Sequence, residues 1–137
     1  MKRRKARELA LKILYQMDIK KESVESILRD FWKHYGNVEE EIKEFAENLA
    51  IGTEKNLKFI DDLISRISKN WQLERMGYID RNILRFATYE IFFVEEVPPI
   101  VSINEAIEIA KTFGGEESPK FINGILHRVK EEKEVKR

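Results

Sequence analysis

The sequence predicts an all-α fold, a single compact domain of about seven helices. Apolar residues recur along most of the chain at the three- and four-residue spacing of amphipathic helices. The short apolar runs at 92–94 and 100–103 lack the alternating pattern and the hairpin partner that strands require. With 137 residues, of which 42% are hydrophobic, the chain can fill one core, so we expect one domain over residues 1–137.

Two amphipathic helices open the chain. The first is expected from about residue 3 to residue 17, where Gly and Pro are absent and apolar residues recur from Ala6 to Met17. Ser23 is a suitable N-cap for the second helix, and Gly36 is a suitable stop after it. The apolar stripe of this second helix consists of Val24, Ile27, Leu28, Phe31 and Tyr35.

Two further helices are expected before residue 70. Asn37 and Glu40 form a plausible capping pair for the third helix, and the residues 52–53, Gly-Thr, punctuate its end. The apolar stripe of the fourth helix covers residues 57–67, and after it the chain is expected to run toward Trp71.

The last three helices have the clearest boundaries. Residues 79–93 are the richest in apolar side chains, which is typical of a central helix, and Pro98-Pro99 ends this region. Ser102 and Glu105 form a capping box for the sixth helix, which Gly114-Gly115 closes. Ser118 as N-cap and Pro119 in the first turn open the seventh helix, and we expect the tail after about residue 130 to fray.

The charges are balanced overall but unevenly placed. There are 25 Lys and Arg against 25 Asp and Glu, and this net charge of zero argues against a nucleic-acid binder. Residues 1–12, however, carry a net charge of +5 and residues 127–137 carry +2, which leaves −7 on the rest. The chain has no cysteine, no membrane-length apolar run and no secretion signal, so we expect a cytoplasmic protein.

The sequence contains no recognisable catalytic or metal-binding pattern. His34 and His127 lie on different expected helices without the spacing of a metal site. Asp61 and Asp62 are adjacent on a helix and point about 100° apart, which does not suit a shared proton. There is also no Cys nucleophile, G-x-S-x-G elbow or P-loop, so we expect no enzyme, cofactor or metal.

The basic start of the first helix is the strongest candidate for binding. Arg3, Arg4 and Arg7 fall on one flank of the apolar stripe, where guanidinium groups can meet successive phosphates of single-stranded RNA. Lys5 and Lys12 fall on the other flank. The alternative is an ordinary solvated helix start, although cations at this end oppose the helix dipole.

Residues 111–121 form a second candidate. Lys111, Phe113, Lys120 and Phe121 flank a glycine turn that leads into a helix N-terminus, where an anion is favoured. The phenylalanine rings offer faces on which unpaired bases can stack. The alternative is that both rings belong to the core.

One arc of the central helix is the third candidate. At 100° per residue its members share a face, and Arg and aromatic residues are typical anchors for a protein partner. The arc comprises Arg81, Arg85, Thr88, Tyr89 and Phe92. The alternative is that the helix is sandwiched and the arc packs against other helices.

Three stretches together resemble the NusB family of bacterial transcription antitermination factors. They are Arg-Lys-Ala-Arg-Glu-Leu-Ala at 4–10 followed by Leu14-Tyr15, residues 80–90, and residues 101–111 with Phe113-Gly114 and residues 118–126. The most specific part is the sequence Lys-Phe-Ile-Asn-Gly-Ile-Leu at 120–126. The resemblance spans nearly the whole chain.

This resemblance implies an RNA-binding protein made of two helical subbundles. Members of the family pair with NusE, a small-subunit ribosomal protein, and bind boxA RNA of ribosomal RNA leaders within an RNA polymerase antitermination complex. The implied RNA-binding residues are Lys2, Arg3, Arg4, Arg7, Lys111, Phe113, Lys120 and Phe121. The implied residues facing NusE are Asp80, Arg81, Arg85, Tyr89 and Phe92.

Two other functions stay open at the level of sequence. One is a detached helical RNA-binding domain of a ribosomal RNA cytosine methyltransferase, since this chain lacks the α/β cofactor domain and the Cys nucleophile of the whole enzyme. The other is a small helical metabolic enzyme that uses scattered Arg and Glu. A homodimer is also expected as a second state, because an exposed aromatic arc can bury itself against a copy.

Overall fold

The computed structural model describes residues 2–69 and 73–135, and these residues form helices without any strand. The predicted all-α class and the seven helices are therefore confirmed for the described part of the chain. The helices are α1 (Lys2–Lys20), α2 (Val24–Tyr35), α3 (Glu40–Lys55), α4 (Leu57–Ile67), α5 (Tyr78–Phe93), α6 (Pro99–Phe113) and α7 (Ser118–Val135), with a short 3₁₀ helix, η1 (Leu73–Arg75), before α5.

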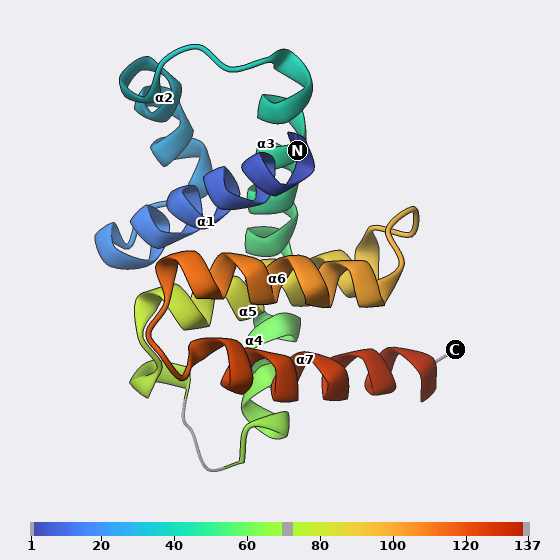
Figure 1. The fold of residues 1–137 in the computed structure, drawn as a ribbon. Coiled ribbons are helices and arrows are strands. Elements are labelled where there is room, and N and C mark those ends of the chain that lie inside the picture. The colour runs from blue at the N-terminus through green and yellow to red at the C-terminus, as the bar shows by residue number, and fades with distance from the viewer. Residues whose placement is uncertain (1, 70–72, 136–137) are drawn as a thin grey trace.

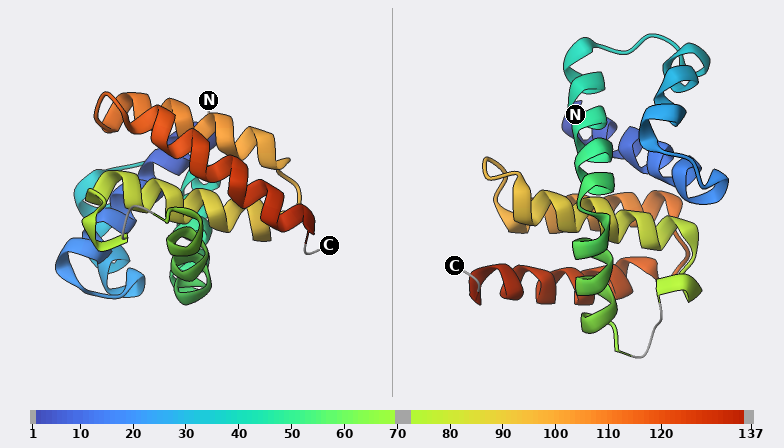
Figure 2. Two further views of the ribbon diagram at one scale, coloured as in Figure 1. Left: turned by 90° about the horizontal axis from the view of Figure 1, so that it is seen from below. Right: turned by 180° about the vertical axis from the view of Figure 1, so that it is seen from behind.

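The helices pack in two groups that share one apolar core. α1, α2 and α3 contact one another, and α4, α5, α6 and α7 form the second group, in which α6 and α7 run alongside α5 (Figure 1). α1 and α3 of the first group lie against α5 of the second. α3 and α4 follow one another across α5 when the molecule is seen from behind (Figure 2).

The predicted ends of α2 are confirmed. Ser23 is the N-cap, and its hydroxyl oxygen accepts a hydrogen bond from the backbone N–H of Ser26 at 3.1 Å. Gly36 follows the last residue with a φ of 106°, a value that glycine adopts without strain.

The predicted boundaries of α3 are wrong at both ends. Glu39, not Asn37, is the N-cap residue, and no side chain caps this end. The helix also continues through Gly52 and Thr53 to Lys55. Gly52 is needed for packing rather than for a turn, because a Cβ at this position would overlap the Tyr89 ring. The expected path toward Trp71 lies outside the described residues.

The start of α6 also differs from the prediction. Pro99 is the first helical residue, a position where the missing N–H costs nothing, so Pro98-Pro99 starts α6 rather than ending the region before it. Ser102 therefore lies inside the helix, where its hydroxyl donates to the Glu90 carboxylate instead of capping.

The prediction for the end of α6 is confirmed, and the prediction for the beginning of α7 is wrong by one residue. Gly114 ends α6 as expected. Ser118, by contrast, is already the first residue of α7, and its hydroxyl accepts from the N–H of Gly115 in the preceding turn at 2.9 Å.

The expected fraying after about residue 130 is not observed up to Val135. α7 continues to this residue and is attached to two other helices. The Lys133 ammonium donates to the backbone carbonyl of Ile91 in α5 at 2.7 Å, and Arg66 of α4 donates to Glu132 at 2.8 Å.

Candidate nucleic-acid interface

Three basic residues at the start of α1 lie on one edge of the molecule, and each is paired with a carboxylate; we call Lys2, Arg3 and Arg4 the basic edge. Lys2 lies 2.9 Å from a Glu39 oxygen and 3.3 Å from a Glu41 oxygen, both at the start of α3. Arg3 lies 3.1 Å from Glu96, in the connection between α5 and α6, and its guanidinium covers the Phe45 ring at 4.5 Å. The predicted cluster is therefore present and neutralised by the protein itself.

Arg4 forms the most regular of these pairs. Its Nε and one terminal nitrogen donate to the two oxygens of Glu105 in α6, both at 2.9 Å, in the forked geometry that suits a carboxylate. The hydrogen bond from Arg4 is the main reason that the pKa of Glu105 lies below its ordinary value. This pair is partly buried, and it ties the start of α1 to α6.

The structure contradicts the prediction that Arg7 offers its guanidinium to a phosphate. The Arg7 side chain is only 3% exposed, and its Nε donates to both oxygens of Glu90 in α5, which is 1% exposed. The hydroxyl of Ser102 also donates to Glu90. Because an ion taken out of water needs a close counter-charge, Arg7 holds α1 against α5 rather than facing solvent.

The turn between α6 and α7 presents the second set of predicted residues. Lys111 and Lys120 are exposed, although Lys111 pairs with Glu108 at 3.0 Å. Phe113 and Phe121 are half-buried and pack against the core. Each ring contributes to the core, as the alternative expects, and keeps part of its surface exposed, so stacking on bases stays a prediction.

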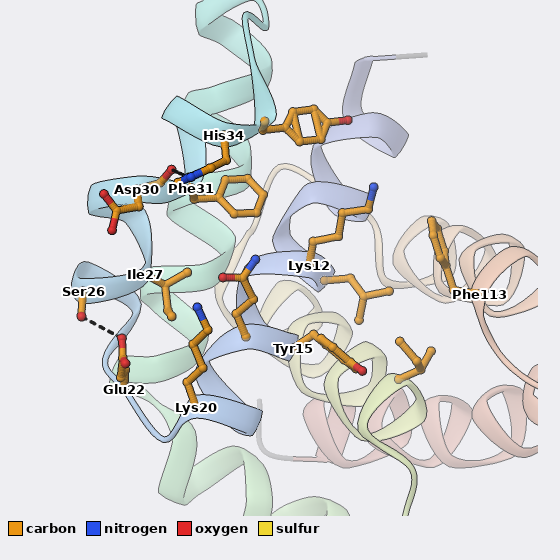
Figure 3. A pocket seen from close by; sticks show the side chains of 14 residues that line it. Lys12, Tyr15, Lys20, Glu22, Ser26, Ile27, Asp30, Phe31, His34 and Phe113 are labelled. Carbon is orange, nitrogen blue, oxygen red and sulfur yellow. Dashed lines mark hydrogen bonds between the residues drawn. The ribbon is translucent and has the colours of Figure 1, made fainter.

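Phe113 lines a cleft of about 740 Å³ between α1 and α2, shown in Figure 3. Lys12 reaches into this cleft, with its ammonium 5.8 Å from the centre of the Phe113 ring and 5.4 Å from that of Tyr35. Tyr15 is on the same wall and is exposed. Lys12 lies half a turn around α1 from Arg3, but it follows Arg4 by about 12 Å along the helix. Arg4 and Lys12 both contact α6, at Glu105 and at Phe113, so the cleft lies beyond Arg4 on the side of α1 that faces α6.

Sequence reasoning missed Tyr15 and the carboxylates of the basic edge. An aromatic ring on the solvated flank of α1 was a usable signal for Tyr15, because such a ring has no role in the core. No signal existed for the ion pairs, whose partners lie from 37 to 101 residues apart in the chain.

The arginines predicted to face a partner are instead used inside the molecule. Arg81 donates to Asp18 of α1 at 2.8 Å, and Arg85 donates to both oxygens of Asp61 in α4 at 2.9 Å and to Asp18 at 3.0 Å. Both side chains are largely buried. They join α5 to α1 and α4, so in this conformation they are not exposed anchors.

Asp18 is the centre of this arrangement. Its burial raises the pKa of the carboxyl, but hydrogen bonds from Arg81 and Asn82 and the charge of Arg85 outweigh burial, and the pKa lies below its ordinary value. Thr88, which shares the arc, is fully buried, and its hydroxyl has no hydrogen-bond partner among the described residues.

The aromatic members of the arc belong to a partly exposed cluster. Tyr89 stacks on Phe93 with ring centres 5.3 Å apart, and Phe92 meets Phe59 of α4 edge-on at 5.2 Å. Phe59 is 37% exposed and Phe93 is 44% exposed. We call these four rings the aromatic patch; it includes two residues, Phe59 and Phe93, that the sequence did not single out.

Asp80 lies apart from the patch, in the first turn of α5. It lines a separate cavity of about 770 Å³ together with Lys120 and Phe121. The structure therefore places one predicted partner residue beside two predicted RNA residues, while Tyr89 and Phe92 lie at the other end of the helix.

Two searches over residues 2–69 and 73–135 gave negative results. No group of three or more His, Cys, Asp or Glu side chains is placed to hold a metal ion. No helix in these ranges combines the length and the apolar character that crossing a membrane would require.

Comparison with known proteins finds relatives that match nearly the whole chain. The model of the family described as the NusB family matches residues 4–131. Over 134 residues, the chain is 48% identical to a transcription antitermination protein NusB of Pelotomaculum thermopropionicum, covering 98% of this chain and 92% of the relative. A protein of the same description from Bacillus cereus is 50% identical over 131 residues, covering 96% and 98%.

Solved structures agree with these relatives. A NusB structure of T. maritima superimposes with a TM-score of 0.86 at 44% identity, covering 95% of this chain and 91% of that one. The fold is also shared, at 24% identity and a TM-score of 0.85, with a chain from a structure of the antitermination factors NusB and NusE in complex with double-stranded RNA, with 96% and 97% coverage.

Proposed function

Because the chain belongs to the NusB family of transcription antitermination proteins, we propose that it binds boxA-type RNA of ribosomal RNA leaders together with NusE. In this proposal it acts in the cytoplasm, within an RNA polymerase antitermination complex, and has no catalytic role of its own. The two alternatives, a detached methyltransferase domain and a metabolic enzyme, receive no support, since the relatives match over almost their full length and carry the antitermination name.

The observation that carries the RNA proposal is the basic edge next to the cleft. Lys2, Arg3 and Arg4 lie at the start of α1, and Lys12, Tyr15 and Phe113 line the cleft that follows Arg4 along the side of α1 facing α6. Cations near phosphates and aromatic faces near bases are the two elements of single-strand binding. A chain of the same fold, 24% identical, occurs in a structure of NusB and NusE with double-stranded RNA, which supports RNA in general as the class of ligand.

The partner proposal rests on charge and on the aromatic patch. Residues 13–126 carry a net charge of −7, which favours a basic protein partner. Tyr89, Phe92 and their neighbours form an apolar surface that a protein can cover. The same surface suits a homodimer, and a monomer at all concentrations in sedimentation, with NusE absent, would exclude that state.

The experiment is a titration of a labelled boxA-type RNA at several salt concentrations, with and without NusE. We expect NusE to tighten binding, since a basic partner adds its own phosphate contacts. Arg3→Ala and Arg4→Ala should each weaken binding and lower the salt slope by up to about 0.7 per lost phosphate contact. A slope that stays unchanged in both variants would contradict the assignment of the basic edge.

A further inference from the structure

The cations of the basic edge and the neighbouring Arg7 all contact carboxylates of the protein itself. Lys2, Arg3, Arg4 and Arg7 contact five carboxylates, which come from α3, α5, α6 and the connection between α5 and α6. These five are Glu39, Glu41, Glu90, Glu96 and Glu105. A phosphate that takes over the hydrogen bonds of one of these pairs must therefore replace a carboxylate as well as water.

These ion pairs fall into two classes by exposure. The pair of Arg7 is buried and that of Arg4 is partly buried, and both fix the position of α1. The pairs of Lys2 and Arg3 are open to water, with Lys2 55% and Arg3 48% exposed. Exposed ion pairs contribute little to stability, so a phosphate can displace their carboxylates at low cost.

We propose that Glu96, together with Glu39 and Glu41, sets the RNA affinity of the protein by competing with RNA phosphates for Arg3 and Lys2. This inference rests on the proposed function and assigns a role to residues outside it. In the free protein the carboxylates occupy the cations. RNA that contacts only the basic edge must overcome this competition, whereas RNA that also reaches the cleft or a bound partner has further contacts to offset it.

Arg3 shows how the competition works at one site. Its guanidinium rests on the Phe45 ring as well as on Glu96, so it keeps one of its two contacts when the carboxylate leaves. Glu96 belongs to the connection between α5 and α6, so its carboxylate can turn away without unwinding a helix. Displacement then leaves an oriented guanidinium ready for a phosphate oxygen.

The competition also changes the salt dependence of RNA binding. When RNA releases its condensed counterions, a displaced carboxylate takes up a cation from solution, and this uptake offsets part of the release. The slope of affinity against salt should therefore be shallower than the number of phosphate contacts implies. Removing the competing carboxylate should make the slope steeper.

The chain offers a matched pair of variants for the test. Glu96→Gln removes the carboxylate that contacts Arg3, and Glu95→Gln makes the same charge change one residue earlier. Glu95 is exposed and has no ion pair among the described residues. The probes are a boxA-type oligonucleotide and an unrelated single-stranded RNA of equal length, each titrated into the full chain over a range of salt.

We expect Glu96→Gln to tighten binding by up to about fivefold at low salt and to steepen the slope, with a smaller effect of Glu95→Gln. The fold gain should be the same for both RNAs, because phosphate contacts carry no sequence information. Adding Glu39→Gln and Glu41→Gln should increase the gain. The gain should vanish in the double variant Arg3→Ala/Glu96→Gln.

The opposite results overturn the inference. Equal gains in RNA affinity for Glu96→Gln and Glu95→Gln would show that net charge alone causes the effect. A gain in affinity that persists in Arg3→Ala/Glu96→Gln would show that Glu96 does not compete for Arg3. If Arg3→Ala weakens RNA binding while Glu96→Gln gains nothing, the proposed function stands and the competition falls. If Arg3→Ala has no effect on RNA binding in the otherwise unchanged chain, Arg3 contacts no phosphate and the competition at Arg3 falls. The assignment of the basic edge falls only if Arg4→Ala is without effect as well.

Discussion

Arg7 was predicted to bind phosphate, but in the structure it is buried in an ion pair with Glu90. The Arg7→Ala variant leaves the Glu90 carboxylate buried without its cation, so we expect the free energy of unfolding to fall by about 3–5 kcal/mol. Urea denaturation at neutral pH measures this loss. The double variant Arg7→Met/Glu90→Gln should recover much of it, since no charge is then buried and Ser102 keeps an acceptor.

A loss of less than about 1 kcal/mol in Arg7→Ala would show that water or another cation compensates Glu90. The matching exposed variant is Lys58→Ala, which breaks an ion pair with Asp62 on the surface of α4. It should cost well under 1 kcal/mol, because exposed pairs are weak.

Asp18 gives the molecule a predictable sensitivity to acid. Its pKa in the folded state lies below the ordinary value of 3.8, so the unfolded chain binds the proton more readily. The stability that this carboxylate contributes is complete above that ordinary value and is lost as the pH falls through the lower folded pKa. We therefore expect urea midpoints to fall steeply below about pH 4.

Asp18→Asn should be less stable than the parent at pH 7 and should lose less stability on acidification, so that the two curves converge at low pH. Asp62→Asn is the control, because Asp62 is exposed and its ion pair within residues 2–69 and 73–135 is with Lys58 alone. Parallel curves for Asp18→Asn and the parent would show that Asp18 does not carry this part of the acid response.

The comparison of Arg3, Arg4 and Arg7 explains what sequence could not provide for the site. Helical periodicity correctly placed all three beside the apolar stripe of α1. It gives the direction of a side chain but not what the neighbouring helix places opposite it. Glu90 and Glu105 lie 83 and 101 residues from their arginines, and only the packed fold brings them together.

At the level of elements, two glycines inside helices have opposite effects. Gly52 of α3 lies under the Tyr89 ring, so Gly52→Ala forces that ring or the helix to move and should cost about 1–3 kcal/mol. Gly124 of α7 has no atom within 4 Å of an added Cβ, and Gly124→Ala should stabilise the protein by about 0.5–1 kcal/mol. Thermal or urea unfolding of both variants measures the difference in sign.

The tyrosine itself offers a check on the cause. Gly52→Ala combined with Tyr89→Phe stays crowded at the ring, whereas combination with Tyr89→Ala removes the overlap. The cost of the added methyl should therefore disappear only in the Tyr89→Ala background. If the stability cost of the methyl group persists in the Tyr89→Ala background, it arises within α3 and not from the contact with α5.

The helices were predictable because each buries a periodic apolar stripe, and α1, α2, α4 and α5 begin and end within about three residues of the prediction. The errors occur where a local signal has a second meaning. Ser102 fits an N-cap in sequence, but Pro99 starts α6 one turn earlier. Gly52 fits a helix stop, but α3 needs it for the approach of Tyr89. Both are tertiary effects.

For the whole molecule, the net charge of zero becomes informative once the pairs are known. The positive start of α1 is not separate from the acidic body, because Glu39, Glu41, Glu96 and Glu105 fold back onto it. The uneven distribution of charge along the sequence is therefore largely neutralised in the folded protein, where carboxylates lie next to the cations. An RNA surface of this kind is expected to depend on a partner more than a bare basic patch would.

The two groups of helices should unfold as one cooperative unit. α1 is joined to α5 and α6 by the Arg7, Glu90 and Glu105 contacts, and again to α5 by Asp18 with Arg81 and Arg85. Separating the groups would break these ion pairs and would also expose the apolar core that α1 and α3 share with α5, so the first group has no low-cost opening of its own. We therefore expect the slowest amide protons of α1 and α3 to exchange with the same opening free energy as those of α5 and α6.

Native-state hydrogen exchange in increasing urea measures these free energies residue by residue. Weakening the connection should separate them: in Asp18→Asn, the amides of α1 to α3 should open at a lower free energy than those of α5 to α7, while Asp62→Asn should keep them equal. Two distinct opening free energies in the unmodified protein would contradict a single unit, because the contacts between α1 and α5 would then be too weak to couple the groups.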